Sequence, residues 1–539
     1  MDGACHESRG WIDLLMRRLT IRDAGIIIAV ALCAGAPVAA IQTGPLWRAW
    51  LAFSVLLALG LAALLAAWRW AGAGRPLAWM IGLALVLRIG AGVGAYLALP
   101  INGYNEPDDR AGFVFTDAHR RDDQAWELAS SNKPIWAAFD KSYYTDQYGG
   151  MLALSALAYK TLSPDAHRPL LVLSLAALAA ALGLPFFFKA AGLVWGERLA
   201  GLAGWLYALY PESVLTGGAQ MREPFLLTLI AIVFYGFAKW QQTRGPRSAS
   251  WMAGGLLGML LISPGIAVVA LVLFAVWWRL GAEDARLRWP WLVGASVILL
   301  AAAGFLVWTI VSRESGGGPV GASVSTWLKD SVNWVVYQLE RGSGQVQNVF
   351  SKLGAPAQFL FVIGYGVTQP VLPPAFFEPT TTTWRIIAIS RALGWYAVLP
   401  LLLYAPAALR HVPAGSGRRV WAWLTIFSWA WIVICAIRAG GDQWDNPRYR
   451  LIFFGIEALV VAFAWSGWRD NRDPWLPRIL AAEIWCVLVF GQWYVARYYL
   501  IGVHLPIMVV LSLCIAGVAV VLGGGAIWDM RAARSRSAT

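Results

Sequence analysis

The sequence predicts an all-α polytopic membrane protein, a bundle of about fourteen transmembrane helices with further helices in its outer loops. Three observations predict this fold. Hydrophobic residues make up 59% of the chain and charged residues only 14%, whereas soluble domains carry about 25% charged residues. The apolar residues gather in runs long enough to cross a bilayer, and arginines occupy every second loop between the runs. Because lipid offers the backbone no hydrogen-bond partner, each apolar run should form a helix.

The expected spans follow one another along the whole chain. They cover residues 24–41, 47–68, 77–99, 168–189, 197–211, 222–240, 250–262, 265–280, 289–311, 385–409, 419–438, 451–468, 478–498 and 503–527. The apolar stretch from 250 to 280 is interrupted by Ser263, Pro264 and Gly265, which are typical of a tight turn. This favours two short spans there over one long helix.

The arginine-rich segments indicate the orientation of the spans. They precede the first span, follow the second and fill every second loop thereafter, with members such as Arg18, Arg75, Arg244, Arg418 and Arg534. With fourteen spans they all fall on one side, which the positive-inside rule identifies as the cytoplasm. Both termini are then cytoplasmic. The first span is expected to be an uncleaved anchor rather than a signal peptide, because so many spans follow it.

The expected organisation has four parts. Residues 1–76 form an N-terminal tail and two spans, and residues 77–311 form a transmembrane core that includes a first outer loop at 100–167. Residues 312–384 form a second outer loop, and residues 385–539 hold the last spans.

Two stretches in these outer loops predict helices that lie along the membrane surface. Residues 148–162 are apolar but too short to span comfortably. In the second loop an amphipathic helix is expected around 328–339, where the apolar residues share one helical face. That face fits packing against the core and gating of a substrate equally well.

The net charge of +13 does not indicate a nucleic-acid-binding protein, because membrane topology accounts for the arginines. Of the five cysteines, four lie inside apolar runs, and no Cys-x-x-Cys pair occurs. Neither a disulfide framework nor a cysteine metal site is predicted.

The first outer loop is rich in acids. They are Glu106, Asp108, Asp109, Asp117, Asp122, Asp123, Glu127, Asp140 and Asp146. A carboxylate just outside a span can act as a general base in a crevice that excludes water. A solvated loop with local ion pairs, such as Asp117 with Arg121 four residues along a helix, is the alternative. From charge alone this alternative is the better interpretation.

The order of motifs around this loop favours the catalytic interpretation. Asp117, Arg121, Ala125 and Leu128 are followed by Asp146-Gln147-Tyr148-Gly149-Gly150, Trp195-Gly196-Glu197-Arg198, Pro211, Arg222-Glu223-Pro224 and, late in the chain, Arg448-Tyr449-Arg450. This series resembles the glycosyltransferase C superfamily, specifically the bacterial relatives of protein mannosyltransferases and aminoarabinose transferases. The resemblance covers residues 80–280 and, more loosely, 440–465.

The chain departs from the family pattern at two points. Arg121 stands where the family has an aromatic residue. The segment from Asp146 to Gly150 stands where the family has a helix start similar to Pro-Pro-Leu-Tyr.

The resemblance implies a transferase that moves a sugar from a polyprenyl-phosphate-linked donor to an acceptor hydroxyl at the outer face of a bacterial inner membrane. The acceptor is a protein, a lipid or a glycan. Some members of the family use a divalent metal, so a metal cofactor stays open. No soluble domain for a nucleotide sugar is expected.

The same resemblance assigns roles to individual residues. Asp117 would deprotonate the acceptor, with Asp146, Asp122 or Asp123 as substitutes. The expected substrate-binding residues are Arg222, Glu223, Arg448, Tyr449, Arg450 and Tyr148. Arginine suits this role because it binds phosphate through paired hydrogen bonds.

Several of these arginines have equally good structural explanations. Arg222 and Glu223 fit the start of a helix, and Arg448 and Arg450 fit interfacial anchors. Arg88 lies close enough to its span end for its side chain to reach the interface. Arg391 lies inside a span and should face the protein interior.

Two other functions remain open at the level of the sequence. A transporter or flippase of lipid-linked glycans would show repeat symmetry and charged or broken spans. Only Arg391 and the break at Ser263–Gly265 point to such a function. A polymerase or ligase of such glycans would carry its arginines in a large late outer loop. The loop at 312–384 holds few.

Overall fold

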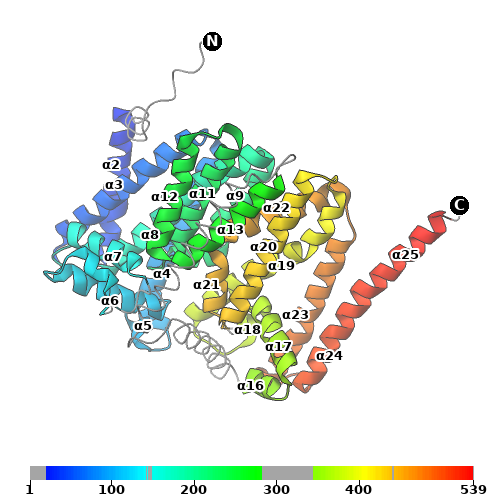
Figure 1. Ribbon diagram of the computed structural model, residues 1–539. Helices are drawn as coiled ribbons and strands as arrows, with labels where there is room; N and C mark the ends of the chain where they lie inside the picture. Colours follow the sequence, from blue (N-terminus) through cyan, green and yellow to red (C-terminus); the bar gives the residue numbers. More distant parts are fainter. Residues whose placement is uncertain (1–19, 141, 144–147, 282–343, 440–441, 538–539) are drawn as a thin grey trace, which may run out of the picture. The chain divides into compact units, whose positions relative to one another are not determined.

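The computed structural model describes residues 20–140, 142–143, 148–281, 344–439 and 442–537 (Figure 1). All regular secondary structure in these ranges is helical. Ten of the described helices are long and apolar enough to cross a membrane, or eleven if one bent pair is a single span. The chain is therefore an all-helical polytopic membrane protein, as the sequence predicts. It divides into two compact units, Met1–Leu271 and Val272–Thr539.

The number of long helices is smaller than the fourteen expected spans, for three reasons. Two expected spans, at 197–211 and 250–262, are helices of 13 and 17 residues, the first well below and the second at the lower limit of the about 17–25 residues that cross a bilayer. The span expected at 451–468 is a helix pair bent by 77°. The span expected at 289–311 lies outside the described residues, as does the amphipathic helix expected at 328–339.

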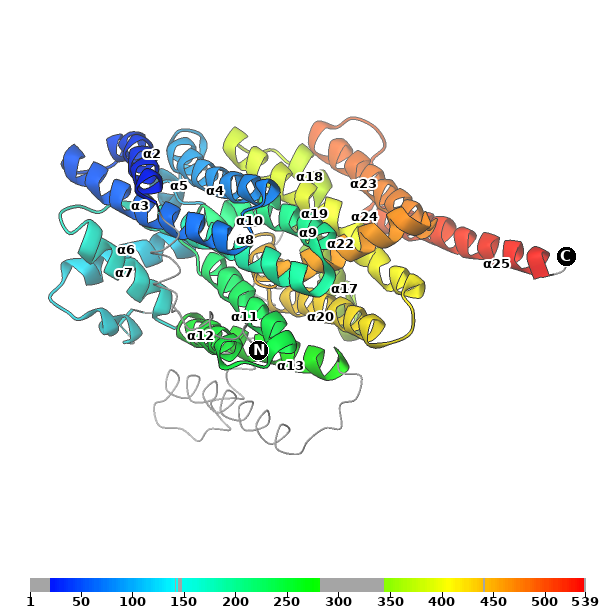
Figure 2. The ribbon, with the colours of Figure 1, turned by 90° about the horizontal axis from the view of Figure 1, so that it is seen from above.

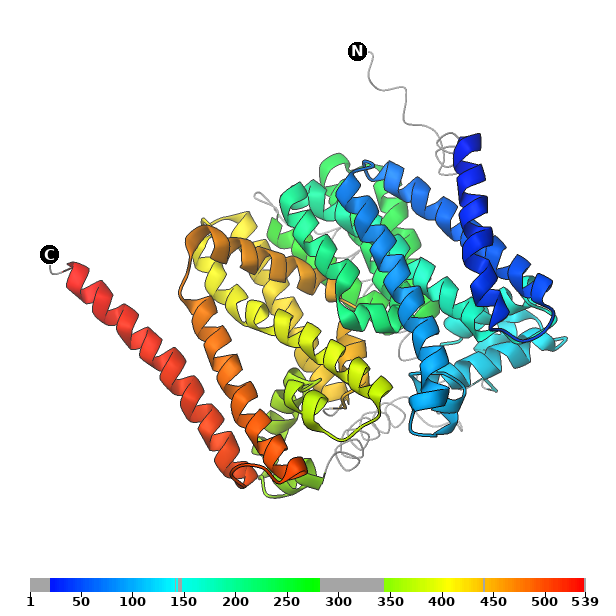
Figure 3. The ribbon, with the colours of Figure 1, turned by 180° about the vertical axis from the view of Figure 1, so that it is seen from behind.

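The first unit is built around one buried helix. Its elements are α2 (Ile21–Ala40), α3 (Leu46–Trp70), α4 (Arg75–Asn102), α5 (Pro107–Arg110), α6 (Thr116–Ser130), η1 (Ile135–Phe139), α7 (Gly150–Leu162), α8 (Pro169–Trp195), α9 (Glu197–Leu209), α10 (Pro211–Gly217), α11 (Glu223–Thr243) and α12 (Pro246–Ile262). Helix α8 packs against α3, α4, α9 and α11. In its most apolar segment, 83% of the residues are buried. Helices α2 and α3 form an antiparallel hairpin, dark blue in Figure 3.

The first outer loop folds into helices that pack on one another. Helix α6 lies beside α7, and η1 contacts both (Figure 2). The apolar stretch expected as a short helix at 148–162 is α7, which has 13 residues. These helices connect the C-terminal end of α4, at Asn102, to the N-terminal end of α8, at Pro169.

Proline determines where several helices of this unit begin. It occupies the first turn of α8, α10, α11 and α12, where its missing N–H costs nothing and its fixed φ suits the helix. Pro211 also holds Tyr210 in an extended conformation, with ψ 121°. The chain therefore breaks between α9 and α10 instead of forming one longer span.

The second unit contains α16 (Gly344–Ser351), α17 (Ala355–Thr368), α18 (Leu372–Phe377), α19 (Thr382–Ala408), η2 (Leu409–His411), α20 (Ser416–Ala439), α21 (Asp445–Leu451), α22 (Phe454–Asn471), α23 (Trp475–Tyr499), α24 (Ile507–Val518), η3 (Ala519–Gly523) and α25 (Gly524–Ser537). In the sequence, the boundary between the two units falls within α13 (Pro264–Gly281). Helix α19 packs against α18, α22 and α23, while α20 packs against α17, α21 and α22. These contacts place α21 beside α20.

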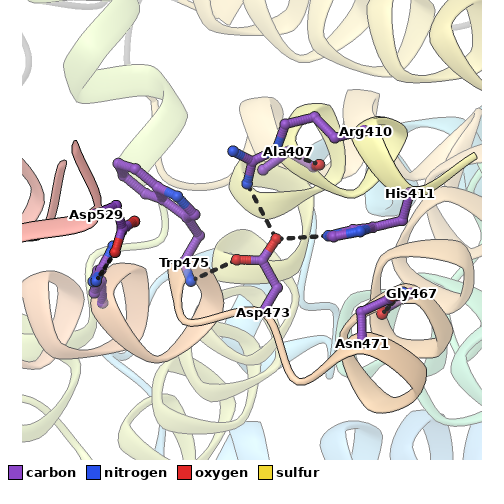
Figure 4. A network of polar contacts seen from close by, with 9 residues as sticks. Ala407, Arg410, His411, Gly467, Asn471, Asp473, Trp475 and Asp529 are labelled. Carbon is purple, nitrogen blue, oxygen red and sulfur yellow. Dashed lines mark hydrogen bonds and ion pairs between the residues drawn. The ribbon is translucent and has the colours of Figure 1, made fainter. Parts of the chain in front are cut away.

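A buried carboxylate ties two turns of the second unit together (Figure 4). Asp473, before α23, accepts hydrogen bonds from Arg410 at 3.1 Å and from the backbone N–H of Trp475 at 3.0 Å, and lies 2.9 Å from His411 Nε2. Burial acts to raise the pKa of Asp473, but the hydrogen bonds with His411 and Trp475 and the charge of Arg410 outweigh it and hold the pKa below its usual value.

Candidate functional site

Asp117, the expected catalytic base, lies exposed in the first turn of α6. The helix begins at Thr116, whose hydroxyl donates a hydrogen bond to Asp108 at 2.5 Å. A carboxylate in the first turn of a helix is stabilised by the helix dipole. Asp117 is thus an accessible acid on a helix whose start is fixed by the preceding loop.

Arg121 lies one turn further along α6 and is buried, with an exposed fraction of 4%. Its Nη1 donates a hydrogen bond to the backbone oxygen of Gln220 at 3.0 Å. The interpretation of Arg121 as part of a surface ion pair is therefore wrong about its exposure. The bond joins α6 to the segment 218–222, which links α10 to α11.

Arg88 of α4 holds the other side of the same region. It is fully buried and donates hydrogen bonds to the backbone oxygens of Tyr207 at 3.2 Å and Ala208 at 3.0 Å and to the hydroxyl of Ser213 at 2.7 Å. The expectation that Arg88 reaches the interface is therefore wrong. The last carbonyls of α9 lack helix partners, and Arg88 supplies donors to two of them across the break at Pro211.

Glycines let α4 approach the start of this segment. A Cβ added at Gly92 would clash with the backbone oxygen of Gly218, and one added at Gly217 would lie 2.6 Å from Arg88 Cδ. Contacts this short are not tolerated in packed interiors. The segment 218–222 is therefore fixed by α4 on one side and by α6 on another.

Three of the expected substrate-binding residues come together at the start of α11. Arg222 is the residue before the helix, and its side chain is 17% exposed. Its guanidinium carbon lies 6.0 Å from the centre of the Tyr148 ring, and its Nε lies 4.0 Å from Oε1 of the buried Glu223. The structure thus places a partly exposed guanidinium near both an aromatic ring and a carboxylate.

The other acids proposed as catalytic lie in different surroundings. Asp122 is fully buried and accepts hydrogen bonds from the hydroxyl of Tyr159 on α7 and, at 2.7 Å, from Nε2 of His167. Burial and the Asp122 carboxylate raise the pKa of Tyr159 well above its usual value. Asp123 is 60% exposed and lies 3.6 Å from Nε2 of His119. Asp146 lies outside the described residues.

In the second unit, the three expected residues lie on α21. Arg448 pairs with Asp445 at 3.0 Å, and the backbone oxygen of Tyr449 accepts a hydrogen bond from Trp431 at 3.2 Å. Both arginines of the motif are buried, with exposed fractions of 4% for Arg448 and 2% for Arg450.

Arg450 is held by the turn that follows α17. It donates hydrogen bonds to the backbone oxygens of Val367, at 3.3 Å, and Gln369, and its guanidinium carbon lies 3.6 Å from the centre of the Trp395 ring. These contacts connect α21 to the end of α17 and to the turn that follows it.

Arg391 faces the protein interior, as expected for an arginine inside a span. It is 3% exposed, donates a hydrogen bond to the backbone oxygen of Gln443 at 3.0 Å and lies 4.4 Å from the centre of the Trp444 ring. It therefore anchors the segment that leads into α21.

In the part of the chain that the structure describes, no three His, Cys, Asp or Glu side chains come together in an arrangement that could hold a metal ion.

The comparisons with known proteins give only distant matches. No family model and no curated protein matches the chain. Among solved structures, the archaeal oligosaccharyltransferase AglB from Archaeoglobus fulgidus in complex with an inhibitory peptide and a dolichol-phosphate aligns over 83% of this chain, with 15% identity and a TM-score of 0.41. The apo form of an Archaeoglobus fulgidus oligosaccharyltransferase aligns over 82%, with 13% identity and a TM-score of 0.39. The chain covers 54% and 56% of those proteins, about half their length. At this distance the likeness adds no argument about activity.

Proposed function

We propose that this protein is a membrane glycosyltransferase that moves a sugar from a polyprenyl-phosphate-linked donor to an acceptor hydroxyl at the outer face of a bacterial inner membrane. One observation carries the proposal. The hydrogen bond from Arg121 to the Gln220 oxygen joins the helix that presents Asp117 to the segment that ends at Arg222. An accessible acid on α6 and a partly exposed guanidinium at the start of α11 thus belong to two segments that are joined by a hydrogen bond.

In this reaction Asp117 takes the proton of the acceptor hydroxyl as its oxygen attacks the anomeric carbon. The bond between that carbon and the phosphate oxygen breaks, and polyprenyl phosphate leaves with the electron pair. Arg222 holds the departing phosphate. Its place at the start of α11 puts the phosphate near the positive end of the dipole of a 21-residue helix. The developing negative charge is thereby met by fixed dipoles and a cation, which lowers the barrier.

The test is turnover of a purified, full-length protein with a synthetic polyprenyl-phosphate sugar, followed as release of polyprenyl phosphate. Asp117→Asn keeps the shape of the side chain and removes its basicity, so turnover should fall by about a hundredfold or more. Asp140→Asn is the matched control, because Asp140 is an exposed acid of the same outer loop. Equal turnover of the Asp117→Asn variant and the parent protein would eliminate Asp117 as the base.

A further inference from the structure

Two aromatic side chains are exposed together on η1, the short helix of the first outer loop. A 3-10 helix has three residues per turn, so Trp136 and Phe139 lie on the same face of η1. They are 74% and 51% exposed, whereas Ala137 and Ala138 between them are buried. The two alanines thus hold η1 against the protein while the aromatic pair is left outside. Adjacent exposed aromatic side chains of this size indicate a surface that something else covers.

Helix α7 runs beside η1 in the opposite direction and extends this apolar surface. At the start of η1, Nζ of Lys160 donates a hydrogen bond to the backbone oxygen of Lys133 at 3.4 Å. At its end, a Cβ added at Gly149, the residue before α7, would lie 2.9 Å from Phe139 Cα. Leu157, between these two points of α7, is 46% exposed. The exposed aromatic pair and Leu157 therefore belong to two helices that are in contact along their lengths.

Two exposed lysines border this surface. Lys160 comes three residues after Leu157, so the two side chains share a face of α7. Lys133 precedes Trp136 by three residues, a separation of at most about 10 Å along an extended chain, and its Nζ lies 5.3 Å from the centre of the Tyr143 ring. Apolar side chains edged by ammonium groups match the boundary between the acyl chains and the phosphate groups of a membrane.

The loop after α7 fixes the surface near the ends of the membrane spans. In this loop the backbone oxygen of His167 accepts a hydrogen bond from the hydroxyl of Thr43 at 2.7 Å, and Arg168 Nε donates one to the Thr43 oxygen at 3.1 Å. Thr43 lies in the turn between α2 and α3. Trp47, 61% exposed at that end of α3, is typical of a membrane–water interface. Lys160 lies within one helical turn of this loop.

We propose that Trp136 and Phe139 insert into the lipid leaflet at this end of the spans, with Lys133 and Lys160 bound to the phosphate groups of anionic lipids. The inference does not depend on the proposed reaction. Lipid removes the two aromatic faces from water, and the ammonium groups stay at the level of the headgroups. Because η1 also contacts α6, the insertion holds the helix of Asp117 at a constant height relative to the membrane.

The test uses the full chain in nanodiscs that contain phosphatidylglycerol and a phospholipid with a photoactivatable diazirine on its acyl chain. Irradiation yields a carbene that forms covalent adducts with side chains in contact with the acyl chains, and mass spectrometry locates the adducts. Trp136 and Phe139 should carry them, as should the reference residue Leu51, which is 55% exposed on α3. Arg120 and Glu127, exposed charged residues of α6, should carry none. Adducts on Leu51 without adducts on η1 would overturn the proposal and leave this surface to a partner in water.

A pair of variants tests the insertion itself. Trp136→Glu places a charge in the proposed lipid contact and should lower the adduct yield of Phe139, relative to Leu51, by about tenfold. Ser130→Glu adds the same charge at an exposed position of α6 and should leave the yield unchanged. An unchanged yield in Trp136→Glu would overturn the insertion, and the Leu51 adduct reports in each case that the variant is still in the membrane.

The role of the two lysines has its own measurement. Replacing phosphatidylglycerol by phosphatidylcholine removes the net negative charge of the headgroups, so the yields on Trp136 and Phe139 should fall severalfold relative to Leu51. Equal relative yields in the two lipids would overturn the binding of Lys133 and Lys160 to anionic lipid.

Discussion

Buried arginines are the side chains whose roles depend most on their three-dimensional surroundings. Arg88 and Arg121 both look from the sequence like charges that reach water, yet their exposed fractions are 0% and 4%. Each donates hydrogen bonds to backbone oxygens of residues that are distant in the sequence. A buried guanidinium is tolerated when such acceptors surround it. At the scale of the residue, these arginines hold in place, through hydrogen bonds, the segment that carries Arg222 and the end of the helix before it.

Arg222 itself should contribute to donor binding. The proposed contact of Arg222 with phosphate is worth on the order of 1.5–3 kcal/mol, so Arg222→Gln should weaken donor affinity by roughly ten- to a hundredfold. Arg222→Lys should restore only part of the loss, because an ammonium cannot reproduce the paired hydrogen bonds of a guanidinium. Donor affinity in nanodiscs measures both effects. Arg244→Gln, at the other end of α11, is the control. Full affinity in Arg222→Gln would reduce Arg222 to an interfacial anchor.

Asp473 should make the stability of the second unit sensitive to acid. Its pKa is lowered in the folded state, so its contribution is present above the usual value of about 3.9 and is lost as the pH falls through the lower folded value. Asp473→Asn should therefore lower the melting temperature at pH 7, and its difference from the parent protein should shrink below about pH 4. Thermal unfolding in detergent across this range measures the difference. A difference that stays constant with pH would show that the carboxylate charge contributes nothing.

At the scale of the element, α6 is held on two faces. Arg121 fastens one face to the segment 218–222. On another face, Asp122 receives hydrogen bonds from Tyr159 and His167, and Trp126 stacks on His167 with ring centres 5.4 Å apart. A helix attached on two faces presents its first turn in a fixed position. This rigidity is what a positioned acid requires.

Arg121→Met should therefore act through position and not through donor binding. Turnover should fall by about ten- to a hundredfold, while donor affinity, which the proposal attributes to Arg222, should change little. Arg121→Lys should recover part of the turnover, because an ammonium can still donate to the Gln220 oxygen. Steady-state turnover and donor affinity, measured side by side, separate the two quantities.

Arg120→Met is the control for this prediction, because Arg120 is the exposed neighbour of Arg121 on the same helix. A parallel loss of turnover and affinity in Arg121→Met would mean that the helix has simply unfolded. In that case Arg121 has no separate positioning role.

At the scale of the whole molecule, the proposed orientation places the arginine-rich loops in the cytoplasm. A cysteine introduced at position 244 or 418 should therefore resist a membrane-impermeant thiol reagent in intact cells and react after permeabilisation. A cysteine at position 140, in the proposed outer loop, should react in intact cells. The chain without added cysteines gives the background from its own thiols. Labelling at 244 or 418 in intact cells would invert the topology and remove the outer-face site.

The sequence by itself determined the class of fold, because the length and apolarity of a membrane span are properties of consecutive residues. It also located the short helix α7 and the inward-facing Arg391. It did not reveal that α9 ends after 13 residues, because that end depends on the break at Tyr210 and Pro211.

Only the tertiary structure decided which polar side chains are accessible. Asp117 and Asp122 lie five residues apart in one acidic run, yet one is exposed and the other is fully buried. Gln220 drew no attention in the sequence, since a single glutamine before a helix has no distinguishing pattern, yet its backbone oxygen accepts the hydrogen bond from Arg121. Burial and partner choice arise from contacts between distant segments, and local sequence patterns do not encode those contacts.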